Sequence, residues 1–192
     1  MLDKATVKQL SELSLTMFRK NFFGIYHGAI SAKLDQENFL INTNDAIFDE
    51  MSSSSFCSLN INKQDYRWKI ASMESHIHAT IYTNIHEAKY IAFGMPIYTT
   101  AYTFEHDSIV FEDYFGRTTF GEIPIYDPGD CETWYNRNAL EITKYLKESP
   151  NNVMVIKGVG AYVYHRDLNE LVKKIAILEN SCRLLSIKTS FC

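Results

Sequence analysis

Every residue from Val153 to Ile156 is apolar, and this short run decides much about the fold. An unbroken apolar run of strand length is typical of a central strand that is buried on both faces. Residues 157–160 break the run, and residues 161–164 are predicted to return as a neighbouring strand. A strand buried on both faces needs a layer of helices on each side of its sheet.

Helical periodicity and end signals place the covering layers. Helices are predicted at residues 5–20, 73–84, 96–104, 131–148 and after Asp167, which is predicted to be the N-cap of the last one, with short strands between them. The Gly-, Thr- and Pro-rich residues 115–130 are predicted to be an ordered loop, with residues 123–125 extended inside it. In the helix at 131–148, Leu140, Ile142 and Leu146 are predicted to face the core. The fold class is therefore α/β: a single domain over residues 1–192, built as a three-layer α/β/α sandwich around a mixed, mostly antiparallel sheet.

Composition argues against several functions. The net charge of −4 and the scattered basic residues give no stripe for nucleic acid. No apolar run approaches the length of a membrane span, and the N-terminal residues lack the layout of a signal peptide. The four cysteines are widely spaced, as in reduced cytosolic proteins. We therefore expect a cytoplasmic protein that binds neither nucleic acid nor membrane.

The stretch around Glu74 contains two nearby histidines and looks at first like a metal site. On a helix, residues two apart point about 200° away from each other. His76 and His78 are therefore not expected to share an ion. Ser72 is predicted to cap this helix, and Glu74 falls in its first turn, where backbone N–H groups favour a negative charge.

Four passages resemble motifs of the class II aldolase/adducin family, which includes sugar-phosphate aldolases and epimerases. They are residues 28–31 followed by 39–43, residues 71–74 followed by His78, residues 123–126 with Gly129, and residues 155–160 leading into the helix with Glu179. Their order covers nearly the whole chain. The resemblance implies the class II aldolase fold, and a homotetramer with its pocket between subunits.

The resemblance also implies a zinc ion held by three histidines. The matching positions in this sequence are Phe93, Met95 and Lys157. A phenyl ring has no donor atom, a thioether is a poor zinc ligand and lysine adds a positive charge. We therefore expect no metal and no other cofactor.

The phosphate-binding positions of the family are only partly present. Gly28, Ser31, Thr43 and Ser72 match them and are candidate phosphate contacts, whereas Ala29 replaces an asparagine. Simple turn and capping chemistry is an equally good interpretation of the four.

Glu74 and Lys157 are the candidate catalytic residues. Glu74 matches the family's acid/base, although helix capping or a salt bridge would explain it as well. Lys157 is predicted to pair with Glu74, so that its ammonium group occupies the place of the ion. A bolder hypothesis makes Lys157 a Schiff-base nucleophile. The single histidines His27, His86, His106 and His165 are predicted to have surface or packing roles.

Two functions follow from this pattern. The first is a metal-free, non-classical family member: a binding or interaction protein, or pseudoenzyme. The alternative is a lyase or epimerase acting on a small sugar phosphate, with a site rebuilt around Glu74 and Lys157. In either case a homo-oligomer is expected, and a small sugar phosphate is the candidate ligand.

Overall fold

The structure is a computed structural model that describes residues 4–189. Its centre is a single eight-stranded sheet with the strand order β3-β2-β1-β4-β8-β7-β6-β5. The strands are β1 (Ala29–Lys33), β2 (Asn38–Asn42), β3 (Phe56–Asn60), β4 (Tyr90–Gly94), β5 (Ser108–Val110), β6 (Glu122–Tyr126), β7 (Val153–Ile156) and β8 (Gly160–His165). Only β6 and β7 pair in parallel; the other described pairs are antiparallel. The predicted mixed, mostly antiparallel sheet is confirmed.

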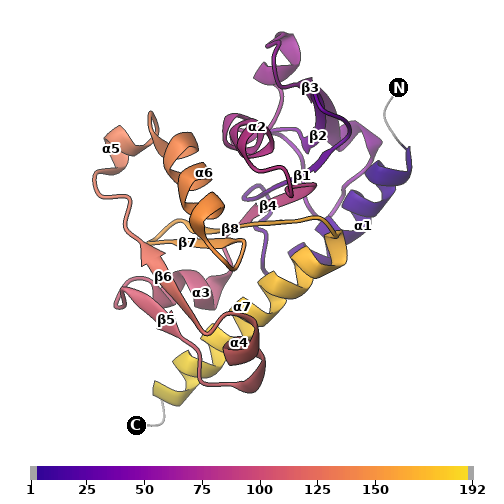
Figure 1. The fold of residues 1–192 in the computed structure, drawn as a ribbon. Helices are drawn as coiled ribbons and strands as arrows, with labels where there is room; N and C mark the ends of the chain where they lie inside the picture. Colours follow the sequence, from indigo (N-terminus) through magenta and orange to yellow (C-terminus); the bar gives the residue numbers. More distant parts are fainter. Residues whose placement is uncertain (1–3, 190–192) are drawn as a thin grey trace.

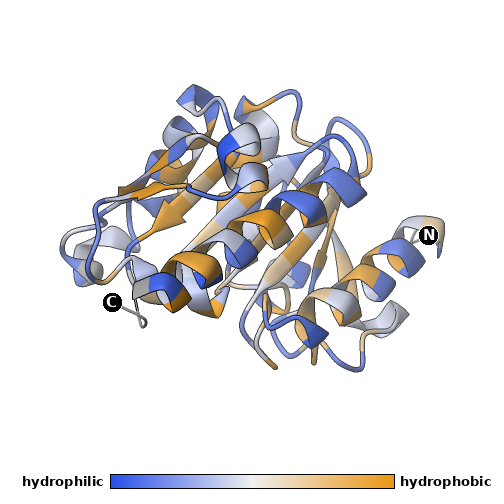
Figure 2. Ribbon diagram, turned by 90° about the horizontal axis from the view of Figure 1, so that it is seen from below, coloured by the Kyte–Doolittle hydropathy of each residue, from blue (hydrophilic) through white to orange (hydrophobic). Residues whose placement is uncertain are grey.

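Helices cover both faces of this sheet. They are α1 (Lys4–Arg19), α2 (Ser75–Asn84), α3 (Ile97–Tyr102), α4 (Tyr114–Thr119), α5 (Cys131–Trp134), α6 (Asn138–Glu148) and α7 (Leu168–Thr189), with short 3₁₀ turns η1 (Ser53–Ser55) and η2 (Tyr66–Lys69). Figure 1 shows α2 and α6 together on one side and the long α7 with α1 on the other. In Figure 2 both α1 and α7 carry alternating hydrophobic and hydrophilic colours along their length, as amphipathic helices do.

Strand β7 explains why the sheet has two cores. Val153 and Val155 belong to the apolar cluster beneath α1 and α7, whereas Met154 and Ile156 belong to the cluster beneath α2 and α6. All four side chains are fully buried. Because side chains alternate along a strand, an unbroken apolar run is what a strand between two helical layers requires. The three-layer prediction is confirmed at this strand.

Two local predictions are wrong. Residues 115–130 are not one loop, because α4 forms after Asp113, whose carboxylate accepts a hydrogen bond from the N–H of Gly116 at 2.9 Å. The extended residues 123–125 inside this segment are confirmed, since they lie in β6. The helix predicted at 131–148 is broken into α5 and α6. Leu140, predicted to face the core, is 70% exposed, while Ile142 and Leu146 are buried.

Helix α7 holds α3 in place through a buried carboxylate. Glu179 accepts hydrogen bonds from the backbone N–H groups of Tyr98 and Thr99, both at 2.9 Å, and from the Thr99 hydroxyl at 2.8 Å. These are N–H groups of the first turn of α3, which a carboxylate stabilises. The start of α7 is itself capped as predicted, because Asp167 accepts from the N–H groups of Asn169 and Glu170.

Within residues 4–189, none of the helices has the length and apolar character needed to cross a bilayer. Cys57 and Cys182 are buried free thiols, and burial raises the pKa of each, to about 11 and about 12. The side chain of Cys131 and the whole of Cys192 lie outside the described part of the chain.

Strands β4 and β8 approach each other closely at Gly160. Gly121, which also has a positive φ but lies outside these strands, serves as the control. A side chain at Gly160 (φ +135°) would collide with the backbone carbonyl of Gly94, whereas at Gly121 (φ +67°) no atom lies within 4 Å. We expect Gly121→Ala to lower the free energy of unfolding by about 1–2 kcal/mol, the cost of a left-handed alanine. Gly160→Ala should lower it by more than about 3 kcal/mol, because the strands must also separate. Urea unfolding measures both; equal losses would contradict the close approach.

Candidate functional site

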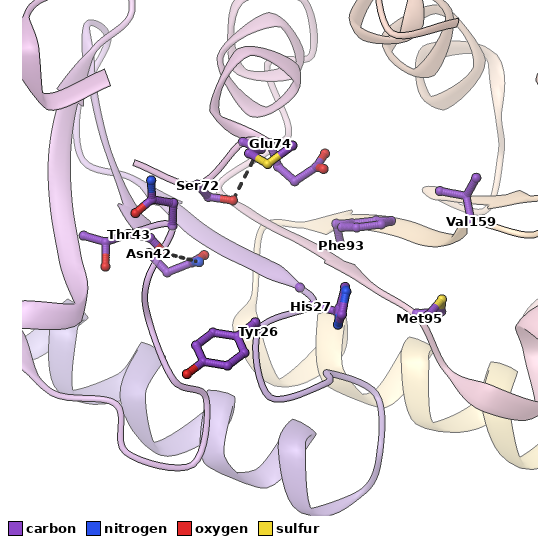
Figure 3. A pocket seen from close by; sticks show the side chains of 12 residues that line it. Tyr26, His27, Asn42, Thr43, Ser72, Glu74, Phe93, Met95 and Val159 are labelled. Carbon is purple, nitrogen blue, oxygen red and sulfur yellow. Dashed lines mark hydrogen bonds between the residues drawn. The ribbon is translucent and has the colours of Figure 1, made fainter. Parts of the chain in front are cut away.

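A cavity of about 230 Å³ opens where the loop before β1, the end of β2, the end of β4 and the start of α2 meet. Figure 3 shows this cavity from close by, with side chains from all four segments turned toward it. Three of the four predicted phosphate contacts, Gly28, Thr43 and Ser72, line it, and so does Glu74. Segments far apart in the sequence thus bring most of the predicted site together.

The polar wall of the cavity is held by Asn42, a residue that was not among the predicted site residues. Its side-chain oxygen accepts from the N–H of Ile30 at 2.9 Å, and its amide nitrogen donates to the carbonyl of Thr43 at 3.1 Å. Its backbone carbonyl accepts from the N–H of Ser72 at 2.9 Å. Asn42 therefore joins β1, β2 and the start of α2. Its place directly before the predicted phosphate contact Thr43 is the sequence feature that could have identified it.

Gly28 is at the entrance to β1 with φ +148°. A Cβ atom there would lie 2.7 Å from Cδ1 of Phe23, so a larger residue would clash with this ring. Glycine is needed at this point of the wall for two reasons, its backbone conformation and the nearby ring.

Ser31 does not line the cavity. Its side chain is fully buried on the α2 side of β1, where its hydroxyl is 2.7 Å from Nδ1 of His78 and 2.7 Å from the Tyr82 hydroxyl. Strand alternation explains this placement: Ile30 and Ala32 belong to the opposite core. Ser31, predicted to contact phosphate, instead makes buried hydrogen bonds within the protein.

The two histidines of α2 diverge as predicted. His76 is exposed and its ring lies 5.0 Å from that of Trp68, measured between centroids. His78 is fully buried, and burial lowers its pKa to about 3, so the ring is neutral. They share no ion.

Glu74 is the last residue before α2, which begins at Ser75 and not at the predicted Met73. Ser72 does not precede the helix directly, but its hydroxyl accepts from the N–H of Glu74 at 3.3 Å. The Tyr162 hydroxyl donates a hydrogen bond to Oε2 of Glu74. Of the described residues, only Tyr162 contacts this carboxylate through a side-chain hydrogen bond. Burial raises the pKa of Glu74, and the Tyr162 hydrogen bond opposes that rise.

Phe93 stacks on Tyr162, with ring centroids 4.6 Å apart and an interplanar angle of 25°. Tyr162 is almost fully buried, and burial together with the Glu74 charge raises its pKa well above the usual value. The phenol therefore remains protonated and serves as a donor. Phe93, Tyr162 and Glu74 form one connected unit beside the cavity.

Lys157 does not pair with Glu74, and this prediction is wrong. Its ammonium nitrogen lies 3.7 Å from Oδ1 of Asp107, beyond the end of α3, and Lys157 is not among the residues that line the cavity. The reason is again alternation: Ile156 faces the α2 layer, so the next residue is directed to the opposite face.

The donor set does not fit a zinc ion. Phe93 and Met95 line the cavity with a ring and a thioether, and Lys157 is directed elsewhere. Within the described chain, no three His, Cys, Asp or Glu side chains are grouped so that they could hold a metal ion. Zinc needs about four N, O or S ligands at close range.

His27 and Tyr26 also line the cavity, from the exposed loop before β1. In the view of Figure 3, the His27 ring lies below Phe93 and the Glu74 carboxylate lies above it. His27 is a surface residue, as predicted, but its place in the cavity was missed. Its position directly before Gly28 was the signal that could have revealed it.

A family model described as the class II aldolase and adducin N-terminal domain matches residues 8–186. The chain therefore belongs to this family. The structure is similar to L-fuculose-1-phosphate aldolase from Thermus thermophilus, with 18% identity and a TM-score of 0.85 over 96% of this chain and 94% of that one. It is also similar to a sugar-phosphate aldolase from Thermotoga maritima, with 14% identity and a TM-score of 0.76 over 98% and 96% of the two chains. At these identities the likeness shows the class II aldolase fold alone. No curated protein sequence matches the chain.

The Glu74–Tyr162 contact predicts a loss of stability when its donor is removed. Tyr162→Phe leaves the half-buried Glu74 acceptor without this donor, so the free energy of unfolding at pH 8 should fall by about 0.5–1.5 kcal/mol. Tyr135→Phe removes a hydroxyl from a tyrosine that is 66% exposed and should have little effect. Urea unfolding measures both variants. A Tyr162→Phe protein as stable as the Tyr135→Phe control would contradict the contact.

Glu74→Gln keeps an acceptor for Tyr162 but removes the buried charge. Since the folded-state pKa of Glu74 is raised, its protonated form favours folding, and that contribution is lost as the pH rises from about 4.5 through the folded value. We expect the stability of the variant, relative to the wild type, to increase over this pH range. Urea unfolding at pH 5 and pH 8 tests the sign; a relative loss at the higher pH would contradict a raised pKa.

Proposed function

We propose that this class II aldolase family member is a metal-free, non-classical form that binds a small anionic ligand of the sugar-phosphate class. The observation that carries the proposal is the replacement of metal-ligating chemistry by Phe93, Met95 and a distant Lys157, beside an open cavity with one polar wall. Such a protein would act by binding its ligand and responding to it, and not as a zinc-dependent lyase.

The polar wall supports an anionic ligand. Gly28, Thr43 and Ser72 line the cavity, and the first turn of α2 begins directly beside it. The N-terminus of a ten-residue helix presents backbone N–H groups and a partial positive charge, both of which favour a phosphate. Asn42 holds this wall through its hydrogen bonds to Ile30 and Thr43, so little ordering is needed on binding.

The second candidate is a lyase or epimerase on a small sugar phosphate. It is favoured by Glu74, a carboxyl group whose pKa is raised by burial at the edge of an open cavity, as a general acid or base requires. Against it, Lys157 pairs with Asp107 and supplies neither a charge nor a nucleophile to the cavity. The first candidate therefore accounts for more of the geometry.

The proposal extends to assembly and location. We propose a cytoplasmic homotetramer, because the family resemblance implies one and because large apolar side chains are exposed beside the cavity. Tyr26 is 60% exposed and Met95 41%. Covering such side chains in a subunit contact would be favourable. Light scattering after size exclusion measures the mass; a monomer at all concentrations would contradict the assembly.

Thr43 tests the anionic ligand. Thr43→Val keeps the shape but removes a hydroxyl from the polar wall. A hydrogen bond to a charged group is worth about 1.5–3 kcal/mol, so inorganic phosphate and dihydroxyacetone phosphate should bind at least about tenfold more weakly. The matched control is Thr118→Val, on exposed α4, which should bind as the wild type does.

Isothermal titration calorimetry measures these affinities, before and after dialysis against EDTA. We expect the wild-type affinity to survive EDTA unchanged, since no ion takes part. An affinity that disappears with EDTA and returns with zinc would contradict the metal-free site. Wild-type protein that binds neither ligand would contradict the anionic-ligand proposal as a whole.

A further inference from the structure

A second cavity, of about 480 Å³, lies on the other side of Glu74, between the start of α2 and the segment that joins α5 to α6. It shares two residues with the first cavity, Met73 and Glu74. The Glu74 carboxyl group is thus positioned between two spaces of different character. Met73 is 75% exposed, so its flexible side chain is the movable part of the boundary.

The second cavity has aromatic and apolar walls. Trp134 and Tyr135 line one side, His76 and Ile77 line the other, and Ala139 leaves room between them. None of the described residues that line it is a lysine or an arginine. Gly28, Thr43 and Ser72, which form the polar wall of the first cavity, do not line this one, whereas a flat uncharged ring would find aromatic faces to stack on.

Hydrogen bonds and a ring contact outside the cavity fix the positions of these walls. Arg137, between Tyr135 and Ala139, donates to Glu141 Oε2 at 2.7 Å and to the carbonyl of Pro128. The Tyr126 hydroxyl donates to the same carboxylate at 2.6 Å, which ties the segment to β6. Across the cavity, the His76 ring rests against Trp68. A cavity whose walls are fixed before binding loses little entropy when it is filled.

We propose that this second cavity binds an uncharged aromatic group, and that the ligand of this protein carries such a group next to its polar end. The inference rests on the proposed function, because it assigns the polar end to the first cavity. The two cavities meet at Met73 and Glu74, so one ligand can reach both. Glu74 would then face the bond that joins the two parts of the ligand.

Two probes test the cavities separately: benzyl alcohol for the second and inorganic phosphate for the first. In ¹⁵N-labelled protein, the indole N–H resonance of Trp134 should shift as benzyl alcohol is added. Ala139→Phe fills the second cavity and should weaken benzyl alcohol binding by at least about tenfold, without changing phosphate binding. The matched control is Leu140→Phe, at the neighbouring position, where the side chain is 70% exposed and outside the cavity.

If Ala139→Phe does not fold, Tyr135→Ala removes an exposed wall and should also weaken benzyl alcohol binding. Saturating phosphate should leave benzyl alcohol binding in place, because the probes occupy different spaces. Several results would overturn the inference: no Trp134 shift, equal binding in the Ala139→Phe and Leu140→Phe proteins, or competition between the probes. A change in oligomeric mass caused by Ala139→Phe alone would also overturn it, since the cavity would then be a subunit contact.

The two proposals can fail independently. If phosphate binds and benzyl alcohol does not, the aromatic subsite is wrong and the proposed function stands. If benzyl alcohol binds and phosphate does not, the anionic site is wrong, and the second cavity belongs to a ligand of another class.

Discussion

The hydrogen bond from Tyr162 to Glu74 determines what this site can be. It places a protonated phenol against a buried carboxylate, and Phe93 stacks on the same phenol ring. A buried carboxylate with a neutral donor beside it retains a raised pKa, whereas a cation would lower it. The environment of Glu74 is thus built from aromatic rings, and a positive side chain is absent from its described contacts.

This arrangement links the sheet to the site. Phe93 comes from β4 and Tyr162 from β8, which lie side by side with these two residues in register. Glu74 precedes α2, in the layer above them. The close approach of the two strands near Gly94 and Gly160 determines where the Phe93 and Tyr162 rings lie. The Tyr162 hydroxyl in turn determines the position of the Glu74 carboxylate. The chemistry of the cavity therefore depends on how tightly the centre of the sheet packs.

Much of the fold could be predicted because a strand that is buried on both faces requires an unbroken run of apolar residues. The apolar run in β7 is such a local signal, and the Asp167 cap of α7 is another local signal. Helix α4 was missed because glycine at position 116 lowers helix propensity, while its Asp113 cap was overlooked. The break before α6 depends on Arg137, whose side chain reaches back to the carbonyl of Pro128, a tertiary contact that local periodicity does not reveal.

Most residues that line the site could be predicted from the sequence, but the contacts that their side chains make could not. Motif matches brought Gly28, Thr43, Ser72 and Glu74 to one cavity. Ser31 and Lys157 were misplaced for a shared reason: a motif gives positions along the chain, and the face of the strand decides where the side chain points. Tyr162 was missed because its partner lies 88 residues away, in another layer of the fold.

The central claim is that aromatic packing stands where metal ligation is expected for this family. Crystals grown with excess zinc and measured across the zinc absorption edge test it directly. The account predicts no anomalous peak in the space bounded by Glu74, Phe93 and Met95. A peak there, at ligating distance from Glu74 and His27, would show that the cavity holds a metal ion and would contradict the account.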